Sequence, residues 1–340
     1  MSNSEKINFS GALGDELAAR LDVPDGKIKA YALFAHCFTC TKDLIAARKI
    51  AEALTIEGIG VLRFDFTGLG GSGGDFSSTN FTSNLEDLRR AADFLRHEFA
   101  APKLLIGHSL GGAAVLAVAD SVPEATAIAT IGAPADVGHV THNFDEYLSD
   151  IERDGQAEVS LGGRPFVIKR QFVEDLGKHS IEKSVAKLHK ALLVMHAPMD
   201  QTVGIENAGR IYDAAKHPKS FVSLDNADHL LRNPDDAEYA ANVIAAWVKR
   251  YLPADAQEVP EIAQGVVVRE TGLGKFQSMV IAGQHRMLAD EPENVGGFDS
   301  GPSPYDYLLA GLGACTAMTM RLYADRKKLP LDQVHVRLTH

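Results

Sequence analysis

The chain has 340 residues, of which 45% are hydrophobic and 23% are charged, and its formal net charge at pH 7 is -11. This composition is typical of a soluble globular protein, and the length is enough for two domains of about 100 to 200 residues each. The negative net charge argues against nucleic acid or an anionic membrane surface as the main partner.

The sequence has no apolar run of the roughly 18 residues that a membrane-spanning helix requires. Its first residues, 1–5, have neither the basic nor the apolar region of a signal peptide. The three cysteines are an odd number in a chain of this length, which does not suggest a disulfide framework. We therefore expect a cytoplasmic protein in a reducing compartment.

The first 252 residues alternate short apolar runs, which are typical of buried strands, with stretches of helical periodicity. A β-hairpin or a β-meander is expected first, over residues 7–23. The expected strands are 31–36, 60–66, 104–106, 127–131, 191–195 and 220–224, and the expected helices are 46–57, 84–99, 112–119, 206–215 and 235–251. This alternation predicts an α/β fold with a doubly wound, mostly parallel sheet that helices cover on both faces.

The segment 103–112 contains Gly107-His108-Ser109-Leu110-Gly111 between an apolar strand and a helix of small residues. This is the G-x-S-x-G pattern in the setting that it requires, a strand followed by a sharp turn and a helix. The turn exposes the Ser109 hydroxyl as a candidate nucleophile. Because the helix begins after Ser109, the Leu110 amide is free to bind a developing oxyanion.

A serine nucleophile needs a base, and the base needs a carboxylate that orients it. Asp200 ends the segment that follows one late strand, and His229 lies in the loop after the next, so the order Ser, Asp, His is that of a hydrolase triad. Asp228 is the alternative acid, and His108 and His196 are the competing bases. We assign both of these histidines to packing beside the site.

The loop 36–40, His-Cys-Phe-Thr-Cys, follows an early strand and is the candidate source of the second oxyanion donor, the Phe38 amide. Cys37 and Cys40 also form a C-x-x-C pair, so a metal or thiol-redox site is an alternative interpretation. A metal site would need further ligands at suitable spacing, and the sequence contains no second pair.

The segment 68–73 matches G-x-G-x-x-G, which leaves dinucleotide binding as another alternative. It follows the second parallel strand, no helix follows it closely, and the expected acidic residue about 20 positions later is missing. The pattern therefore favours a structural turn.

Residues 134–190 interrupt the strand–helix alternation. The stretch 158–169 predicts two short strands around a Gly-Gly turn, with helical stretches on both sides. An insertion this late in the sheet would lie over the carboxyl ends of the strands. We interpret it as a small lid that shapes the acyl or alcohol pocket.

Taken together, residues 1–252 resemble the α/β-hydrolase superfamily, in the branch of small esterases and serine peptidase-like hydrolases. The resemblance implies an acyl-transfer enzyme that cleaves small esters, thioesters or amides through an acyl-Ser109 intermediate, with no cofactor and no metal. The alternative is that the hydrolase fold serves as a non-catalytic binding scaffold.

A polar linker is expected at 253–264, and a second domain at 265–340. Strands are predicted at 266–269, 276–282 and 285–288, a helix at 307–327 and a final strand at 334–338. The residues Ala289-Asp-Glu-Pro, Gly301-Pro-Ser-Pro and Ala314-Cys315-Thr resemble part of an OsmC/Ohr-type domain, a family of thiol-dependent organic hydroperoxide reductases.

That resemblance implies a peroxide-attacking role for Cys315, which is the alternative function of the chain, and pairing of this partial domain in a homodimer. We expect the segment to be disordered unless it dimerises. Arg269 and Arg286 are imperfectly placed candidates for the family's activating arginine, and Asp306 occupies the acidic position near the helix start. The family resolves its sulfenic acid with a second cysteine further along, and no cysteine follows Cys315 in this sequence.

We therefore predict that the chain does not turn over as a two-cysteine peroxidase, because the sulfenic acid at Cys315 has no resolving thiol after it. The measurement is consumption of cumene hydroperoxide in the presence of a dithiol. Steady consumption that Cys315→Ser abolishes would contradict the prediction.

Overall fold

The computed structural model describes residues 3–25, 28–161, 163–252, 265–272, 274–283 and 285–339. The chain folds into two compact units, Met1–Pro253 and Ala254–His340. The predicted linker lies outside the described residues. Within the described ranges, no helix combines the length and the apolar character needed to cross a membrane.

The described residues of the first unit form an eight-stranded sheet in the order β1-β2-β4-β3-β5-β6-β9-β10. Its strands are β1 (Asn3–Ser10), β2 (Glu16–Val23), β3 (Ala30–Ala35), β4 (Ile59–Phe64), β5 (Leu104–His108), β6 (Ala127–Ile131), β9 (Ala191–His196) and β10 (Lys219–Ser223). The β1–β2 hairpin pairs antiparallel with β4, and every pairing from β4 to β10 is parallel. The predicted hairpin and mostly parallel sheet are both confirmed.

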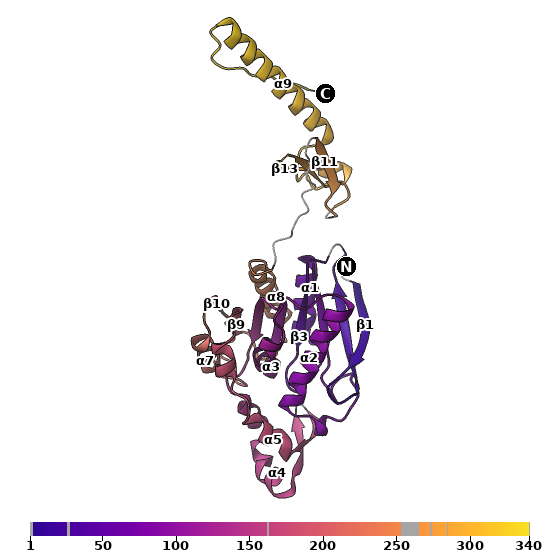
Figure 1. Ribbon diagram of the computed structural model, residues 1–340, viewed down its shortest axis with the longest axis vertical. Coiled ribbons are helices and arrows are strands. Elements are labelled where there is room, and N and C mark those ends of the chain that lie inside the picture. Colours follow the sequence, from indigo (N-terminus) through magenta and orange to yellow (C-terminus); the bar gives the residue numbers. More distant parts are fainter. Residues whose placement is uncertain are drawn as a thin grey trace. The chain divides into compact units, whose positions relative to one another are not determined.

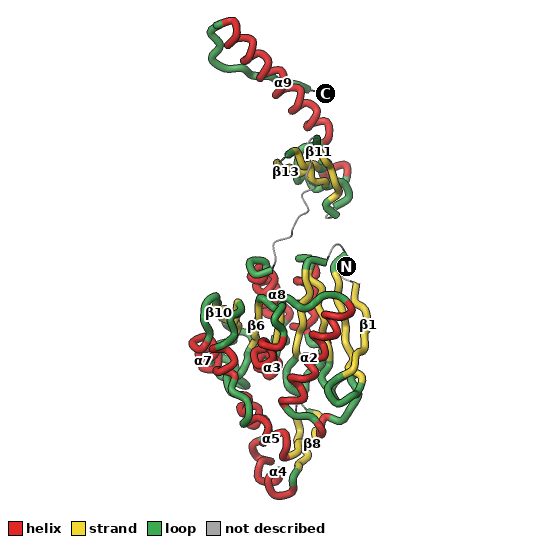
Figure 2. Tube along the Cα trace, viewed as in Figure 1, coloured by secondary structure: helices red, strands yellow, loops and turns green. Residues whose placement is uncertain are grey.

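Helices cover the two faces of this sheet (Figures 1 and 2). They are α1 (Ile45–Ile56), α2 (Phe81–Glu98), α3 (Leu110–Val118), α7 (Glu206–Ala214) and α8 (Pro234–Val248). Leu33 and Leu105 pack with α2, α3 and α7, whereas Phe34 and Ile106 pack with α1 and α8 on the opposite face. Because both faces are buried, the central strands β3, β4, β5, β6 and β9 are buried at every position and mostly apolar, which is why the sequence shows continuous apolar runs.

Residues 134–190, the predicted lid, lie at one end of the sheet (Figure 2). They contain the antiparallel pair β7 (Gln156–Leu161) and β8 (Arg164–Lys169) with helices α4 (Leu148–Asp154), α5 (Arg170–Leu176) and α6 (Ile181–Ala186). Asp175 at the end of α5 accepts hydrogen bonds from the backbone N–H of Thr82 at 2.7 Å and from its hydroxyl at 2.8 Å. This pair of bonds ties the insertion to the first turn of α2.

The second unit contains the antiparallel sheet β11 (Val266–Glu270), β12 (Ser278–Ala282) and β13 (His285–Ala289), followed by the long helix α9 (Pro304–Lys327). Helix α9 begins with Pro304 in its first turn and a capping box between Ser303 and Asp306. The three strands and the helix predicted for this segment are thus confirmed, and disorder in the absence of a dimer stays a prediction. The predicted strand at 334–338 is wrong, because those residues pair with no strand among the described ones and stay irregular.

A buried ion pair joins β2 to β4 and reaches the loop that follows β3. The Arg63 Nε donates to Asp22 Oδ2 at 2.7 Å, and another guanidinium nitrogen donates to the Lys42 carbonyl at 2.5 Å. Asp22 and Arg63 are 5% and 3% exposed, so neither charge can be hydrated if its partner is removed.

Asp22→Ala should therefore lower the free energy of unfolding by about 3 kcal/mol or more, because the Arg63 guanidinium stays buried without its carboxylate. Urea denaturation measures this difference. Glu86→Ala, which removes exposed pairs with Arg89 and Arg90 on α2, is the control and should cost less than about 1 kcal/mol. Equal losses in the two variants would count against a structural role for the buried pair.

Candidate active site

Ser109 occupies the strained turn between β5 and α3. Its φ of 54° and ψ of -124° place a non-glycine residue in a conformation that L side chains rarely adopt. The turn folds back so tightly that a Cβ at Gly107 would lie 2.2 Å from the Gly111 carbonyl oxygen. A Cβ at Gly111 would lie 2.4 Å from the carbonyl oxygens of Ala35 and His36. Neither position has room for a side chain, so both residues have to be glycine, and the turn packs directly against the end of β3.

The imidazole of His229 lies between Ser109 and Asp200. Its Nε2 is 2.9 Å from Ser109 Oγ, and its Nδ1 is 2.6 Å from Asp200 Oδ2. Asp200 follows β9 and His229 follows β10, so the three side chains meet where parallel strands end. The carboxylate also accepts the backbone N–H groups of Thr202 at 2.8 Å and Val203 at 2.9 Å.

The environment of Asp200 favours its ionised form. Burial by itself would raise the pKa of this carboxyl, but the bonds from His229, Val203 and Thr202 together hold the pKa below its ordinary value. An ionised Asp200 keeps the proton of the neutral imidazole on Nδ1. The lone pair of Nε2 is then directed at the serine hydroxyl.

Gly132, at the end of β6, is a residue of this site that the sequence analysis missed. It has a φ of +56°, and a Cβ there would lie 3.3 Å from His229 Nδ1 and 3.4 Å from Asp200 Oδ2. Since β6 lies between β5 and β9 in the sheet, its end passes beside the Asp–His pair. The signal in the sequence was only a glycine directly after an apolar strand.

The competing bases lie elsewhere in the site. His108 is fully buried, and its Nε2 donates to the His229 carbonyl at 2.6 Å. His196 is also fully buried, and its Nε2 donates to the Val203 carbonyl at 2.7 Å. Each therefore supports the backbone of a loop that carries another member of the Ser–His–Asp set, instead of facing the hydroxyl.

Asp228, the alternative acid, accepts the N–H groups of Leu230 and Arg232 and pairs with the Arg232 guanidinium at 3.2 Å. It closes the turn around His229. The carboxylate that contacts the imidazole is Asp200.

The loop 36–40 lies against the start of α3, as the contact of Gly111 with the carbonyls of Ala35 and His36 requires. Leu110 is the first residue of α3, so its N–H has no carbonyl one turn earlier within the helix. Phe38 lies in the neighbouring loop and lines the same pocket as Leu110. Assignment of these two amides as oxyanion donors stays a prediction.

Cys37 and Cys40 are joined by a disulfide, so the inference of a reducing environment from the odd number of cysteines does not hold for this pair. The turn between them brings their Cα atoms to 5.3 Å, within the range that a disulfide spans. The count of cysteines could not reveal this pairing, because a local turn decided it. Within the described ranges no group of three or more His, Cys, Asp or Glu side chains is arranged to hold a metal ion.

Residues 26–145 match the family described as serine aminopeptidase, S33, and residues 297–340 match OsmC-like protein. The chain is similar to the esterase domain of a protein from Rhodothermus marinus, with 52% sequence identity and a TM-score of 0.61. The match covers 74% of this chain and 100% of that domain. The chain belongs to the α/β-hydrolase superfamily. Its first unit is an enzyme domain of this superfamily, joined to an OsmC-like segment.

Two further relatives are more distant. The mitochondrial palmitoyl-protein thioesterase ABHD10 of Rattus norvegicus is 28% identical over 205 residues, 57% of this chain and 66% of that protein. The match thus spans just under two thirds of the thioesterase. Est1E from Butyrivibrio proteoclasticus, in a structure with ferulic acid bound, is 19% identical to this chain and has a TM-score of 0.60. The match covers 72% of this chain and 98% of Est1E. This last likeness shows the fold alone.

The G-x-G-x-x-G segment of the hydrolase unit is a structural turn. A Cβ at Gly70 would lie 2.2 Å from Asp65 Oδ2, and the same oxygen accepts the Gly71 N–H at 2.9 Å. Asp65 also binds the Lys42 ammonium group at 2.6 Å. The Asp65 carboxylate thus binds the backbone of this turn, and the next α-helix, α2, begins only at Phe81, so the segment lacks the helix N-terminus that a dinucleotide-binding turn leads into.

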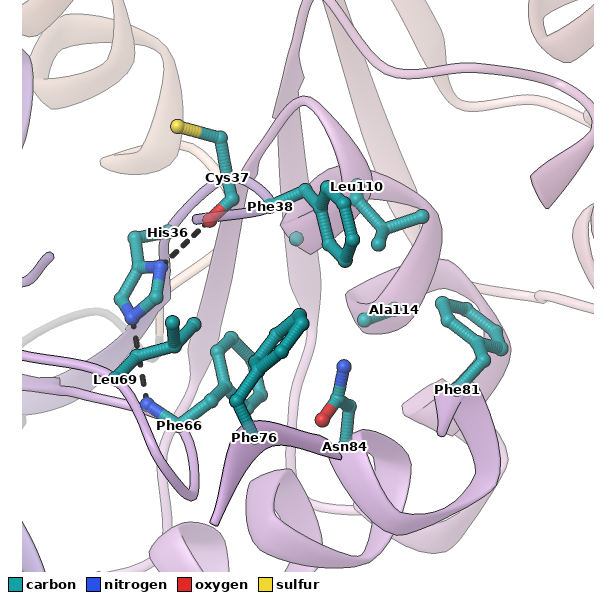
Figure 3. A pocket seen from close by; sticks show the side chains of 11 residues that line it. His36, Cys37, Phe38, Phe66, Leu69, Phe76, Phe81, Asn84, Leu110 and Ala114 are labelled. Carbon is teal, nitrogen blue, oxygen red and sulfur yellow. Dashed lines mark hydrogen bonds between the residues drawn. The ribbon is translucent and has the colours of Figure 1, made fainter. Parts of the chain in front are cut away.

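A mostly apolar pocket lies beside the serine turn of the hydrolase unit (Figure 3). Loop 36–40 and the start of α3 form one wall, and the segment from β4 to α2 forms the other. Its lining residues are His36, Cys37, Phe38, Phe66, Leu69, Phe76, Phe81, Asn84, Leu110, Gly111 and Ala114.

Cys315 is an exposed free thiol on α9 of the second unit. Asp306 is occupied with capping the same helix, where its carboxylate accepts the Ser303 hydroxyl at 2.7 Å. Arg269 lies on β11 and Arg286 on β13, and the assignment of an activating arginine stays open between them.

The stability of the hydrolase unit should fall in mild acid partly because of His108. Burial, with the nearby His229 imidazole, lowers the pKa of His108 from 6.5 to about 4. Between these values the unfolded chain binds a proton that the folded chain does not, so His108's contribution is complete above pH 6.5 and is lost as the pH falls towards 4.

His108→Gln should therefore flatten the dependence of the unfolding free energy on pH across this window, by up to about 1.4 kcal/mol per pH unit. Urea denaturation at a series of pH values measures the slope. His36 and His196, whose pKa values burial also lowers, remain in both proteins, so the difference reports His108. Identical slopes would contradict the assignment.

Proposed function

We propose that the hydrolase unit is a serine hydrolase that cleaves small carboxylic esters or thioesters through an acyl-Ser109 intermediate. The observation that carries the proposal is the continuous pair of hydrogen bonds from Ser109 Oγ through His229 to Asp200, at 2.9 and 2.6 Å. The names of two relatives, an esterase domain and a thioesterase, support the same class of reaction.

In the first half of the reaction, His229 Nε2 takes the proton of the Ser109 hydroxyl as Oγ attacks the carbonyl carbon. The negative charge that develops on the carbonyl oxygen is stabilised by the N–H groups of Leu110 and Phe38. The C–O or C–S bond to the leaving group then breaks, and His229 returns its proton to the departing alcohol or thiol.

In the second half, water replaces the alcohol. His229 accepts a proton from the water as its oxygen attacks the acyl-Ser109 carbonyl, and it then protonates Ser109 Oγ as the acid departs. Asp200 stabilises the imidazolium that forms in each half and holds the ring in register without itself accepting the proton.

Ser109→Ala should abolish turnover of p-nitrophenyl acetate and labelling by a fluorophosphonate probe, because both need the hydroxyl. Asp200→Asn should lower kcat by a factor on the order of 10³ to 10⁴, since an amide no longer fixes the tautomer of His229. Kinetics and mass spectrometry of the labelled peptide measure these effects. Persistent turnover in Ser109→Ala would favour the binding-scaffold alternative.

The observation that favours a second function is the exposed Cys315 within the OsmC-like segment. A peroxide can oxidise such a thiol to sulfenic acid, and a second thiol must reduce it for turnover. Labelling of thiols without labelling of Ser109 would move the assignment from hydrolysis to this thiol chemistry.

A further inference from the structure

The loop that carries Phe38 is closed by a covalent link. The Cys37–Cys40 disulfide encloses Phe38 and Thr39, and the Cys40 N–H donates to the Cys37 carbonyl at 3.2 Å across the same turn. Among the described residues, the N–H groups of Phe38 and Leu110 donate to no acceptor. Unused N–H groups beside the serine turn are what an oxyanion site requires. The disulfide thus spans one of the two proposed donors.

The core of the hydrolase unit fixes both ends of this loop. At its start, Cys37 is buried and its carbonyl accepts from His36 Nδ1 at 2.8 Å. After the loop, the Lys42 N–H donates to Asp65 Oδ1 at 2.6 Å. These bonds hold the ends, but they do not set the direction of the peptide groups between them.

The turn between these ends is strained. Thr39 has a φ of 64°, in the left-handed region that a β-branched residue rarely adopts. Its carbonyl accepts from the guanidinium group of Arg164, an exposed residue of β8. A backbone conformation of this kind persists only when its surroundings hold it, and the disulfide is the covalent part of that hold. Breaking the S–S bond therefore allows the Phe38 N–H to turn away from the oxyanion site.

The Phe38 ring is held independently of the disulfide. Its centroid lies 5.6 Å from that of Phe76 and 5.4 Å from that of Phe172 in the lid. These apolar contacts do not depend on the S–S bond. Reduction should therefore change the direction of the backbone N–H and leave the loop attached to the wall of the pocket.

The two cysteines differ in their access to solvent. Cys37 is 4% exposed and its side chain points away from the pocket, whereas Cys40 is partly exposed (Figure 3). An external thiolate therefore attacks Cys40 Sγ, the S–S bond breaks, and Cys37 leaves as a thiolate. The second thiol group of a dithiol then attacks the mixed disulfide and releases Cys40. The dithiol supplies both electrons, becomes a disulfide, and gives its two protons to the cysteines.

We propose that Cys37 and Cys40 form a thiol-exchange site that controls the hydrolase, with a small dithiol as the reactant. The oxidised pair is a positioning group for the Phe38 N–H, and its reduction slows acyl transfer to Ser109. The inference rests on the proposed serine-hydrolase function and adds a redox-dependent state of its oxyanion site.

The test reduces the full chain with dithiothreitol, removes the dithiol by gel filtration under nitrogen, and measures hydrolysis of p-nitrophenyl acetate. Alkylation by iodoacetamide and mass spectrometry show whether the pair is reduced. Reduction should lower kcat about 10-fold or more, towards the roughly 10²- to 10³-fold that loss of one oxyanion donor costs, with KM little changed. Reoxidation with diamide should restore kcat.

Two variants separate this pair from the third cysteine. Cys40→Ser should have the low kcat of the reduced enzyme, with and without dithiothreitol. Cys315→Ser is the control and should respond to reduction and reoxidation as the wild type does. Circular dichroism shows whether each variant is folded, and Cys40→Ala replaces Cys40→Ser if the latter is not.

A pair that stays oxidised in dithiothreitol, or an unchanged kcat in protein shown to be reduced, overturns the proposal. So does a folded Cys40 variant with the kcat of the oxidised wild type, or a Cys315→Ser variant that no longer responds to dithiothreitol. In each of these cases the serine-hydrolase proposal stands if fluorophosphonate labels Ser109 in the oxidised wild type and that protein hydrolyses the ester. If the oxidised wild type is neither labelled nor active, both proposals are overturned.

Discussion

The hydrogen bond between His229 and Ser109 constrains much of the hydrolase unit, because its two residues are 120 positions apart in the chain. They meet only if β5, β9 and β10 run parallel and end at one edge of the sheet. The backbone bond from Ser109 N–H to the Ile131 carbonyl, at 2.8 Å, ties the serine turn to β6. The next residue, Gly132, has to be small because it passes beside the imidazole and its carboxylate.

The same constraint reaches the neighbouring loop. Close packing of Gly111 against the end of β3 sets the place where loop 36–40 begins. The loop continues to Lys42, whose carbonyl accepts from Arg63 and whose ammonium group binds Asp65. The turn 68–73, which matches the G-x-G-x-x-G pattern, also binds Asp65 and so helps to hold this loop. The charged groups of Lys42, Arg63 and Asp65 thus fix the position of this loop, and each of them has a partner within the unit.

Hydrophobic packing joins the insertion 134–190 to the pocket beside Ser109. The rings of Phe166 and Phe172 belong to the insertion and contact Phe76 and Phe38, which line the pocket, so the insertion packs against the wall of the site. The Thr82–Asp175 bonds hold it at the first turn of α2, the same turn that carries Asn84. The second unit is different, because α9 buries only Ala324 among its described residues and depends on its caps and backbone bonds.

The sequence by itself determined the local features. The continuous apolar runs and the small residues around Ser109 are patterns of a few neighbouring positions, and they predicted the α/β sheet, the β7–β8 pair and the serine turn. The order of Ser109, Asp200 and His229 along the chain, each after a predicted strand, gave the other candidate residues. The order of motifs also favoured His229 over His108 and His196 as the base, and the tertiary structure showed what the other two do, because each donates to the backbone carbonyl of a neighbouring loop.

Tertiary structure also decided the features that no local pattern contains. The place of Gly132 beside the imidazole, the set of segments that line the pocket beside Ser109 and the lack of a strand partner for residues 334–338 among the described residues all depend on contacts between segments far apart in the chain. The physical reason is that periodicity and turn chemistry act over a few residues, whereas the shape of a pocket and the pairing of a strand depend on which surfaces meet when the chain is packed.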